Sequence, residues 1–219
     1  MQQSCLASKC FFALALTIFL GITPAALASE FTIGLKAWDA SLSADNLEGG
    51  DDLFQGIYFS WGINDNWSVT GGYVEGEVDF QVAGTTVTGT IEEVDADLIV
   101  HRRLTKRLEI GAGYRSAEFT TVIGGTADAI ESAGPTVFLG GGALFGQSRN
   151  WGYYWGLAFM FDDMEDDDGS QEHFNGEGGI RWTANDFAVL LGYRYKEYSG
   201  DGIDGSKFDG PVLNLAYTF

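Results

Sequence analysis

The stretch WGYYWGLAFMF, from Trp151 to Phe161, alternates between two kinds of side chain. Its odd-numbered positions are all aromatic or large and apolar, whereas its even-numbered positions include two glycines and an alanine. A period of two places these sets on opposite faces of an extended strand. The stretch therefore predicts a β-strand with one bulky, wholly apolar face.

The same alternation recurs in segments of about ten residues, each bounded by Gly, Asn, Asp or Ser. We expect ten strands, near 30–38, 53–62, 66–79, 86–102, 107–119, 135–146, 151–162, 173–183, 187–198 and 210–219. If two of these segments are rim structure, the count falls to eight. In TVFLGGGALF (136–145) either face could be the apolar one.

Alternation alone also fits a soluble sandwich or a lipocalin-like barrel, so the composition of the two faces decides the fold class. Here the apolar face carries the largest rings, and the opposite face carries Gly, Thr, Asn and charged groups. A small barrel has little interior room, which suits the Gly-rich face turned inward. Water would make the aromatic face an aggregation hazard, whereas lipid solvates it. We predict an all-β, transmembrane, antiparallel up-and-down β-barrel.

The connections between the expected strands differ in length. Short ones lie at 62–66, 103–106, 146–150 and 183–186, and longer polar ones lie near 41–52, 120–133, 162–172 and 199–209. One end of the barrel should therefore have tight turns and the other end loops. An even strand number leaves both termini at the tight-turn end. Aromatic residues flank three tight turns, as an interfacial girdle would: Trp61, Trp67, Phe145, Trp151, Trp182 and Phe187.

Residues 1–28 have the features of a signal peptide. Lys9 precedes the apolar run Phe11–Ile22, and Ala26 and Ala28 occupy the positions that a signal peptidase recognises. The apolar run is shorter than the roughly 20 residues that a membrane-crossing helix needs. We therefore expect cleavage after Ala28 and export.

The remaining chain, 29–219, is expected to be one outer-membrane β-barrel domain. Both cysteines, Cys5 and Cys10, fall in the leader, so the mature domain has no disulfide and no lipid-modified cysteine. With 31 acidic residues against 12 basic ones, the net charge of −19 excludes nucleic acid as a partner. Aromatic residues make up 14% of the chain, which contradicts disorder. We expect no cofactor.

The chain ends in PVLNLAYTF (211–219), an apolar alternation that places a ring beside the terminal carboxylate: Leu213, Leu215, Tyr217 and Phe219. With this ending the chain resembles the small outer-membrane β-barrel proteins of Gram-negative bacteria, the opacity-protein-like and OmpA- or OmpX-like barrels. RLTKRLEIGAGYR (103–115) is similar to a turn and rising strand common in that group. The resemblance implies that the four residues form the signal recognised by the outer-membrane insertion machinery. It also implies a place in the cell outer membrane, among its lipid and lipopolysaccharide.

The inward face is expected to carry five acids and five bases, namely Lys36, Glu93, Asp95, Asp97, Glu109, Arg115, Glu177, Arg181, Arg194 and Lys196. A low-dielectric lumen penalises an unpaired charge, so equal numbers indicate mutual pairing. The set fits either a plugged structural core or a narrow, charge-lined pore. The limited interior of a small barrel favours the plug.

The run DDMEDDDGSQEH (162–173) is the densest acidic segment and is expected in an outer loop. Its candidate cation ligands are Asp162, Asp163, Glu165, Asp166, Asp167 and Asp168. The EF-hand pattern fails, because Met164 and Asn175 stand where its first Asp and final Glu should be. Loose divalent-cation binding, or bridging to lipopolysaccharide, competes with a solvated charged loop, and the solvated loop is favoured.

Two groups of residues raise the question of catalysis: Ser170 with Glu172 and His173, and His101 with Asp97. Neither matches a recognisable motif of barrel proteases or lipid A deacylases, so we expect no enzymatic activity. The basic run HRRLTKR (101–107) is expected to be a solvated tight turn, with periplasmic contact as the alternative. The expected function is a structural or surface-interaction role. A narrow porin-like channel is the alternative, and a hydrolase acting on lipid A or peptides is least favoured.

Overall fold

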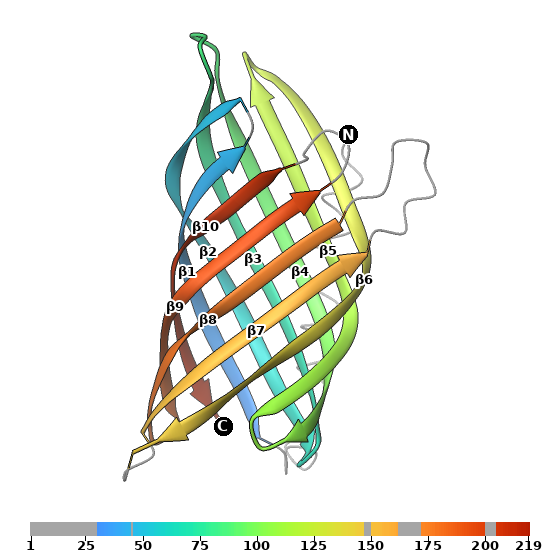
Figure 1. The fold of residues 1–219 in the computed structure, drawn as a ribbon, viewed down its shortest axis with the longest axis vertical. Helices are drawn as coiled ribbons and strands as arrows, with labels where there is room; N and C mark the ends of the chain where they lie inside the picture. The colour runs from blue at the N-terminus through green and yellow to red at the C-terminus, as the bar shows by residue number, and fades with distance from the viewer. Residues whose placement is uncertain (1–29, 45, 147–149, 162–171, 200–204) are drawn as a thin grey trace.

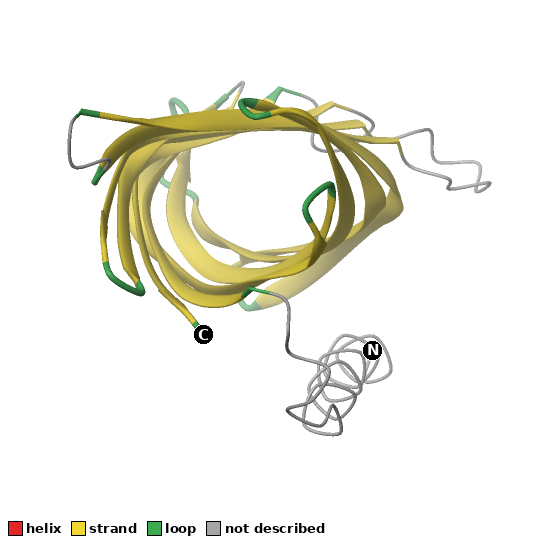
Figure 2. Ribbon diagram, turned by 90° about the horizontal axis from the view of Figure 1, so that it is seen from below, coloured by secondary structure: helices red, strands yellow, loops and turns green. Residues whose placement is uncertain are grey.

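The computed structural model describes residues 30–44, 46–146, 150–161, 172–199 and 205–219. These residues form ten antiparallel strands that close into an up-and-down barrel (Figures 1 and 2). The strands are β1 (Phe31–Ala44), β2 (Leu47–Asn64), β3 (Trp67–Val82), β4 (Thr88–Thr105), β5 (Leu108–Ile123), β6 (Thr126–Phe145), β7 (Trp151–Phe161), β8 (Glu172–Ala184), β9 (Phe187–Ser199) and β10 (Ser206–Thr218). The predicted fold class is confirmed, with ten strands rather than eight. The expected signal peptide, 1–28, lies outside the described residues.

The first and last strands close the barrel. β1 pairs with β10 from Thr32↔Thr218 to Ser43↔Lys207, and each other strand pairs with its neighbours in sequence. The amide of Phe219 donates to the carbonyl of Phe31 (2.7 Å), and their rings stack at 6.0 Å. This contact lies at the same end as the turns between β2 and β3, β4 and β5, and β8 and β9. We call it the turn end and the opposite end the loop end.

No helix among the described residues is long and apolar enough to span a membrane.

Two of the four predictions of a long loop are wrong. The segment near 41–52 is a hairpin, because β1 continues to Ala44 and β2 begins at Leu47. The segment near 120–133 is also a hairpin, in which β5 and β6 are joined by Gly124 and Gly125 with φ of 59° and 83°. Glycine tolerates the positive φ that such a two-residue turn requires at both positions. At the loop end, the hairpins β3–β4 and β5–β6 extend beyond the other strands (Figure 1).

The other two expected loops are only partly described. Residues 162–171 and 200–204 lie outside the described residues, while β8 begins at Glu172 and β10 at Ser206.

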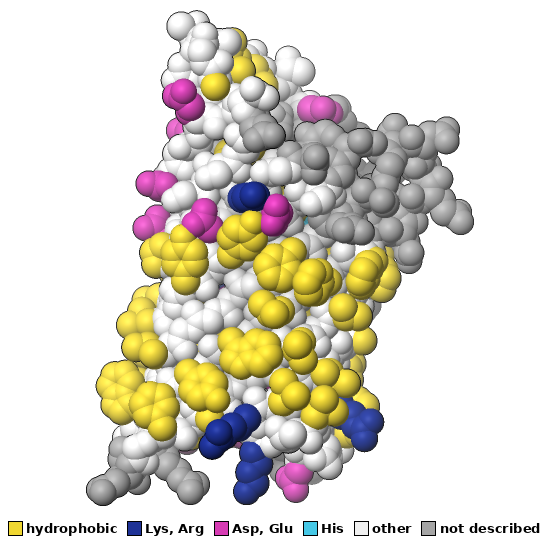
Figure 3. Space-filling model, in the orientation of Figure 1, with side chains coloured by type: hydrophobic (Ala, Val, Ile, Leu, Met, Phe, Trp, Pro, Cys, Tyr) yellow, Lys and Arg dark blue, Asp and Glu magenta, His cyan; other side chains and the backbone are white. Residues whose placement is uncertain are grey.

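In the turn half of the barrel, the apolar face of each strand points outward. On β7, Trp151, Tyr153, Phe159 and Phe161 are all more than two-fifths exposed. Such side chains form a belt around this half, which we call the apolar belt (Figure 3). Its members include Ile33, Leu35, Ile57, Leu98, Val100, Ile110, Val137, Leu139, Ile180, Leu191 and Leu215. For 136–145 on β6, where the sequence left the outward face undecided, Val137 and Leu139 point outward.

Toward the loop end the two faces exchange character. On β1 the outward residues Ile33 and Leu35 are followed, on the opposite parity, by the fully buried Trp38 and Ala40. On β3 the outward series turns acidic after Tyr73, while the inward series changes from Ser68 and Thr70 to apolar residues from Val74 onward. The barrel is therefore apolar outside and polar inside at the turn half, and polar outside and apolar inside at the loop half.

Inward glycines make room for rings inside the barrel. A Cβ atom on Gly34 would lie 2.3 Å from the ring of Tyr58, and one on Gly76 would lie 2.4 Å from the ring of Phe54. Both distances are shorter than any real contact, so these rings lie inside only because the facing position lacks a side chain.

Candidate functional site

All ten residues expected in the lumen lie on the inward parity of their strands. The structure brings five of them together around Asp95. Arg115 donates two hydrogen bonds to this carboxylate, from Nε to Oδ1 (2.7 Å) and from Nη2 to Oδ2 (2.8 Å). Lys196 Nζ (2.7 Å) and Arg194 Nη2 (3.3 Å) also donate to Oδ2. One carboxylate on β4 thus receives cations from β5 and β9.

Glu93 completes this group, which we call the charge layer: Glu93, Asp95, Arg115, Arg194 and Lys196. Its carboxylate accepts hydrogen bonds from Lys196 and, at 2.8 Å, from the hydroxyl of Tyr198. Lys196 is 0% exposed, and Arg115 is 1% exposed. Asp97 lies 3.9 Å from Arg115, so three cations face three carboxylates. Charges removed from water in this way are tolerated only when they are paired and hydrogen-bonded.

Toward the loop end a layer of rings covers the charge layer. This aromatic layer consists of Trp38, Phe54, Phe119, Tyr198 and Phe208, all less than 5% exposed. The ring centroids of Trp38 and Phe54 lie 5.2 Å apart, and those of Phe119 and Tyr198 lie 4.3 Å apart. The guanidinium of Arg194 lies 4.6 Å from the Trp38 ring centroid and links the two layers. Favourable edge-to-face and cation–π geometry at these distances stabilises a dry interior.

The charged side chains inside the turn half are more exposed than those of the charge layer. Lys36 Nζ lies 2.6 Å from Glu177 Oε2, and the two side chains remain 18% and 17% exposed. Asn214 donates to the other oxygen of Glu177 at 2.9 Å. Arg181 donates to the hydroxyl of Thr183 (3.2 Å) rather than to an acid. This half is therefore a polar vestibule that ends at the charge layer.

The candidate catalytic pair of His101 and Asp97 does not form. Residues four apart on one strand are about 13 Å apart, which is too far for a hydrogen bond. His101 Nε2 instead lies 2.6 Å from the hydroxyl of Thr70, and Nδ1 lies 4.0 Å from Glu109.

In the other candidate catalytic group, His173 is 1% exposed and its ring meets Tyr198 edge-on at 4.0 Å. Buried among rings, this imidazole has no access to a substrate outside the barrel. Ser170 lies outside the described residues.

The candidate cation ligands Asp162 to Asp168 also lie outside the described residues. Within the described ranges, no group of three or more His, Cys, Asp or Glu side chains is arranged to hold a metal ion. The described part of the loop end instead carries outward-facing acids on β3 to β6. This acidic collar consists of Glu75, Glu77, Asp79, Glu92, Glu118 and Glu131. On the face shown in Figure 3, most acids lie above the apolar belt and most bases lie at the opposite end.

Aromatic residues mark both edges of the apolar belt. At the turn end lie the six expected girdle residues, of which Trp67, Phe145, Trp151, Trp182 and Phe187 are exposed. At the upper edge, Tyr195 donates a hydrogen bond to Glu197 (2.6 Å), and Tyr193 donates one to Asp209. Rings with one polar end suit a boundary between an oily phase and water. The upper row of tyrosines was not expected from the sequence, although Tyr193 and Tyr195 directly precede Glu197 on the same parity.

The residues of the expected insertion signal lie on the outward face of β10. Leu215 is exposed, and the ring of Tyr217 meets those of Phe187 and Phe219, each at a centroid distance of 4.9 Å. The terminal ring thereby joins the girdle at the turn end.

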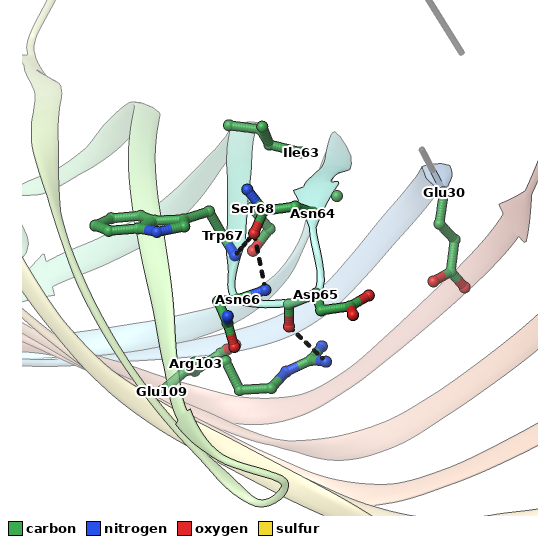
Figure 4. Close-up of a pocket in the computed structure, with 10 residues that line it drawn as sticks. Glu30, Ile63, Asn64, Asp65, Asn66, Trp67, Ser68, Arg103 and Glu109 are labelled. Atoms are coloured by element: carbon green, nitrogen blue, oxygen red, sulfur yellow. Dashed lines mark hydrogen bonds between the residues drawn. The ribbon is translucent and has the colours of Figure 1, made fainter. Parts of the chain in front are cut away.

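A pocket of about 230 Å³ opens at the turn end beside the β2–β3 turn (Figure 4). Its polar lining includes Glu30, Asp65, Ser68, Arg103 and Glu109. Arg103 Nη1 donates to the carbonyl of Asp65 (3.2 Å), while the Trp67 ring points away from Glu30. The pocket is open to solvent and does not extend into the charge layer.

The sequence matches no protein-family model. It also matches no curated protein. Among solved structures, the outer-membrane protease OmpT from Escherichia coli is similar with a TM-score of 0.55 and 10% identity, over 88% of this chain and 97% of OmpT. This chain has the fold of the Gram-negative outer-membrane β-barrels.

Two further similar structures are Ail, the attachment invasion locus protein of Yersinia pestis, and OprG of Pseudomonas aeruginosa. Ail has a TM-score of 0.43 and 11% identity over 87% of this chain and 99% of Ail. OprG has a TM-score of 0.42 and 14% identity over 88% of this chain and 96% of OprG. At these identities the similarity concerns the fold and does not carry an activity from any of the three proteins to this chain.

Proposed function

We propose that this protein is an exported, integral outer-membrane barrel with a closed lumen, which acts structurally or through interactions at the cell surface. The observation that carries the proposal is the stacking of the charge layer under the aromatic layer. Lys196, Tyr198, Trp38 and Phe54 are each 0% exposed, so solvent reaches none of them from either end. A pore needs a continuous water path, and buried paired charges under packed rings oppose one.

Conductance in planar bilayers tests the closed lumen. We expect the purified barrel to insert without stable current steps above the leak of the bare bilayer. Trp38→Ala removes a ring from the aromatic layer and should increase brief openings, whereas Trp182→Ala removes a ring from the outer girdle and should leave the current unchanged. Stable, ion-conducting steps in the unmodified protein would contradict the closed lumen.

A narrow porin-like channel is the second candidate function. The partly exposed Lys36–Glu177 pair and the 26% exposed Asp97 side chain favour it, because they give the turn half a hydrated vestibule. This channel would require the aromatic layer to move. A hydrolase acting on lipid A or peptides is the least supported function, because the candidate histidines His101 and His173 are both buried.

For partners, we propose outer-membrane lipid and lipopolysaccharide around the belt, and the insertion machinery acting on Leu213, Leu215, Tyr217 and Phe219. The acidic loop end would favour cationic partners or divalent cations that bridge to lipopolysaccharide. Register pairs Glu77 with Glu92 and Glu118 with Glu131, and like charges directly opposite each other repel. Calorimetric titration with calcium, which should release or absorb heat, tests the cation proposal.

A further inference from the structure

The bases of this chain fall into two groups. Ten lie within the described residues, and five of them form ion pairs: Lys36, Arg115, Arg194, Lys196 and Lys207. The other five have no carboxylate within ion-pairing distance in the part of the chain that the structure describes, and all lie in the turn half: Arg102, Arg103, Lys106, Arg107 and Arg181. In a chain with 31 acids, unpaired bases gathered at one end point to an anionic partner there.

Four of these five bases belong to the β4–β5 turn, which we call the basic turn: Arg102, Arg103, Lys106 and Arg107, all exposed. The two other described tight turns differ in charge, because they carry Asp65 and Asp186. Arg103 faces Glu109 across the strand pair and donates to the carbonyl of Asp65, so its charge is partly offset. The bases free to meet an anion outside the barrel are Arg102, Lys106 and Arg107.

Arg102 lies at the lower edge of the apolar belt. It shares the outward parity of Val100 and Leu104, which are both more than two-fifths exposed. It is the register partner of Trp67, and its guanidinium carbon lies 5.7 Å from the Trp67 ring centroid. The stacked pair therefore presents a fixed cation, next to apolar side chains, at the level where an interfacial tryptophan meets lipid headgroups.

We propose that the basic turn binds the phosphate of anionic phospholipids, of the phosphatidylglycerol type, in the periplasmic leaflet. The guanidinium offers paired donors that match phosphate oxygens, and Lys106 and Arg107 add charge beside it. Basic residues next to a membrane surface are attracted by anionic lipid, and each contributes separately. The inference rests on the proposed outer-membrane placement, with the turn end facing the periplasm.

Native mass spectrometry of the full barrel in detergent tests this site. The barrel is supplied with equal amounts of phosphatidylglycerol and phosphatidylcholine, and retained lipids are counted. We expect several-fold more phosphatidylglycerol than phosphatidylcholine, with a preference that weakens as salt is added. The triple variant R102Q/K106Q/R107Q should retain the two lipids equally.

Lys207→Gln is the control for Arg102→Gln, because it removes a base that is paired with Glu197 at the loop end, at the opposite end of the barrel from the basic turn. We expect only the Arg102 variant to lose part of its preference for phosphatidylglycerol over phosphatidylcholine. Equal retention of both lipids by the unmodified barrel, or full preference in the triple variant, would overturn the inference. Stronger retention of lipid A than of phosphatidylglycerol would overturn the assignment to a phospholipid. Because the salt series uses unmodified protein, a folding defect in a variant does not decide the outcome. A barrel that stays monomeric without detergent would instead contradict the proposed function.

Discussion

The turn half and the loop half of the same strands obey opposite rules. In the turn half, Leu35 and Leu98 point outward while Lys36 and Asp97 point inward. In the loop half, Glu77 and Glu92 point outward while Val78 and Ile91 are buried inside. Each half places its apolar side chains away from water, and only the position of the water differs. The first half is built for an oily surrounding and the second for an aqueous one.

The charge layer lies where the two halves meet. Below it Lys36, Asp97 and Glu177 remain partly exposed, and above it the lumen is filled by rings. The ion-paired side chains that meet across the lumen are most deeply buried in the charge layer. The comparison therefore predicts that substitutions at the junction have larger effects than similar substitutions in the vestibule.

The largest expected effect is that of Asp95→Ala. It leaves Arg115, Arg194 and Lys196 without their shared carboxylate, and breaking such a buried group lowers the free energy of unfolding by about 3–5 kcal/mol. Asp97→Ala, in the partly hydrated vestibule, should lower it by less than half as much. Urea unfolding in lipid vesicles, followed by circular dichroism, measures both. Equal effects at the two positions would remove the distinction between junction and vestibule.

A smaller effect is expected for Trp38→Ala. The ring is fully buried in the aromatic layer, so its loss leaves a cavity and lowers the free energy of unfolding by about 3 kcal/mol. Trp182→Ala is the control, because this ring faces outward in the turn half and detergent or lipid fills the space. The same unfolding measurement compares them. If Trp182→Ala lowered the free energy of unfolding as much as Trp38→Ala, an outward ring in the turn half would matter as much as a buried ring in the loop half, which would contradict the comparison.

The smallest expected effect is a gain. Glu77→Gln removes one of two like charges placed opposite each other in the acidic collar, which should raise the free energy of unfolding by about 0.2–1 kcal/mol. The gain should shrink as salt is added, because exposed charges are screened. Glu48→Gln, an exposed acid opposite Gln81, is the control. The measurement is made with a metal chelator, and a loss of stability in Glu77→Gln under that condition would contradict the repulsion between Glu77 and Glu92.

Much of the turn half could be predicted from the sequence. The alternation in Trp151 to Phe161 predicted both the strand and its outward face, and the aromatic residues beside the tight turns marked the lower edge of the belt. Prediction failed toward the loop end. There the outward residues become polar, so 41–52 and 120–133 lost the amphipathic contrast and were expected to be loops. The Gly124–Gly125 pair was the available signal for a hairpin.

The aromatic layer could also have been found from the exchange of parity. On β1 the apolar residues occupy odd positions up to Ala37 and even positions from Trp38, and this exchange marks where a strand passes from lipid to water. On β9 the outward rings likewise end at Tyr195, and the next ring, Tyr198, lies at an even position and points inward. A search for a single apolar face along each strand overlooks it.

By itself the sequence determined which side chains share a face and which end carries the tight turns, because the period of a strand and the residues of a turn are local properties. Only the tertiary structure decided which inward side chains meet. Asp95 and Lys196 are 101 positions apart on strands that do not pair, and their contact exists because closure of the barrel places opposite walls within reach of one lysine. That distance depends on strand number and register around the whole ring, which no single segment encodes.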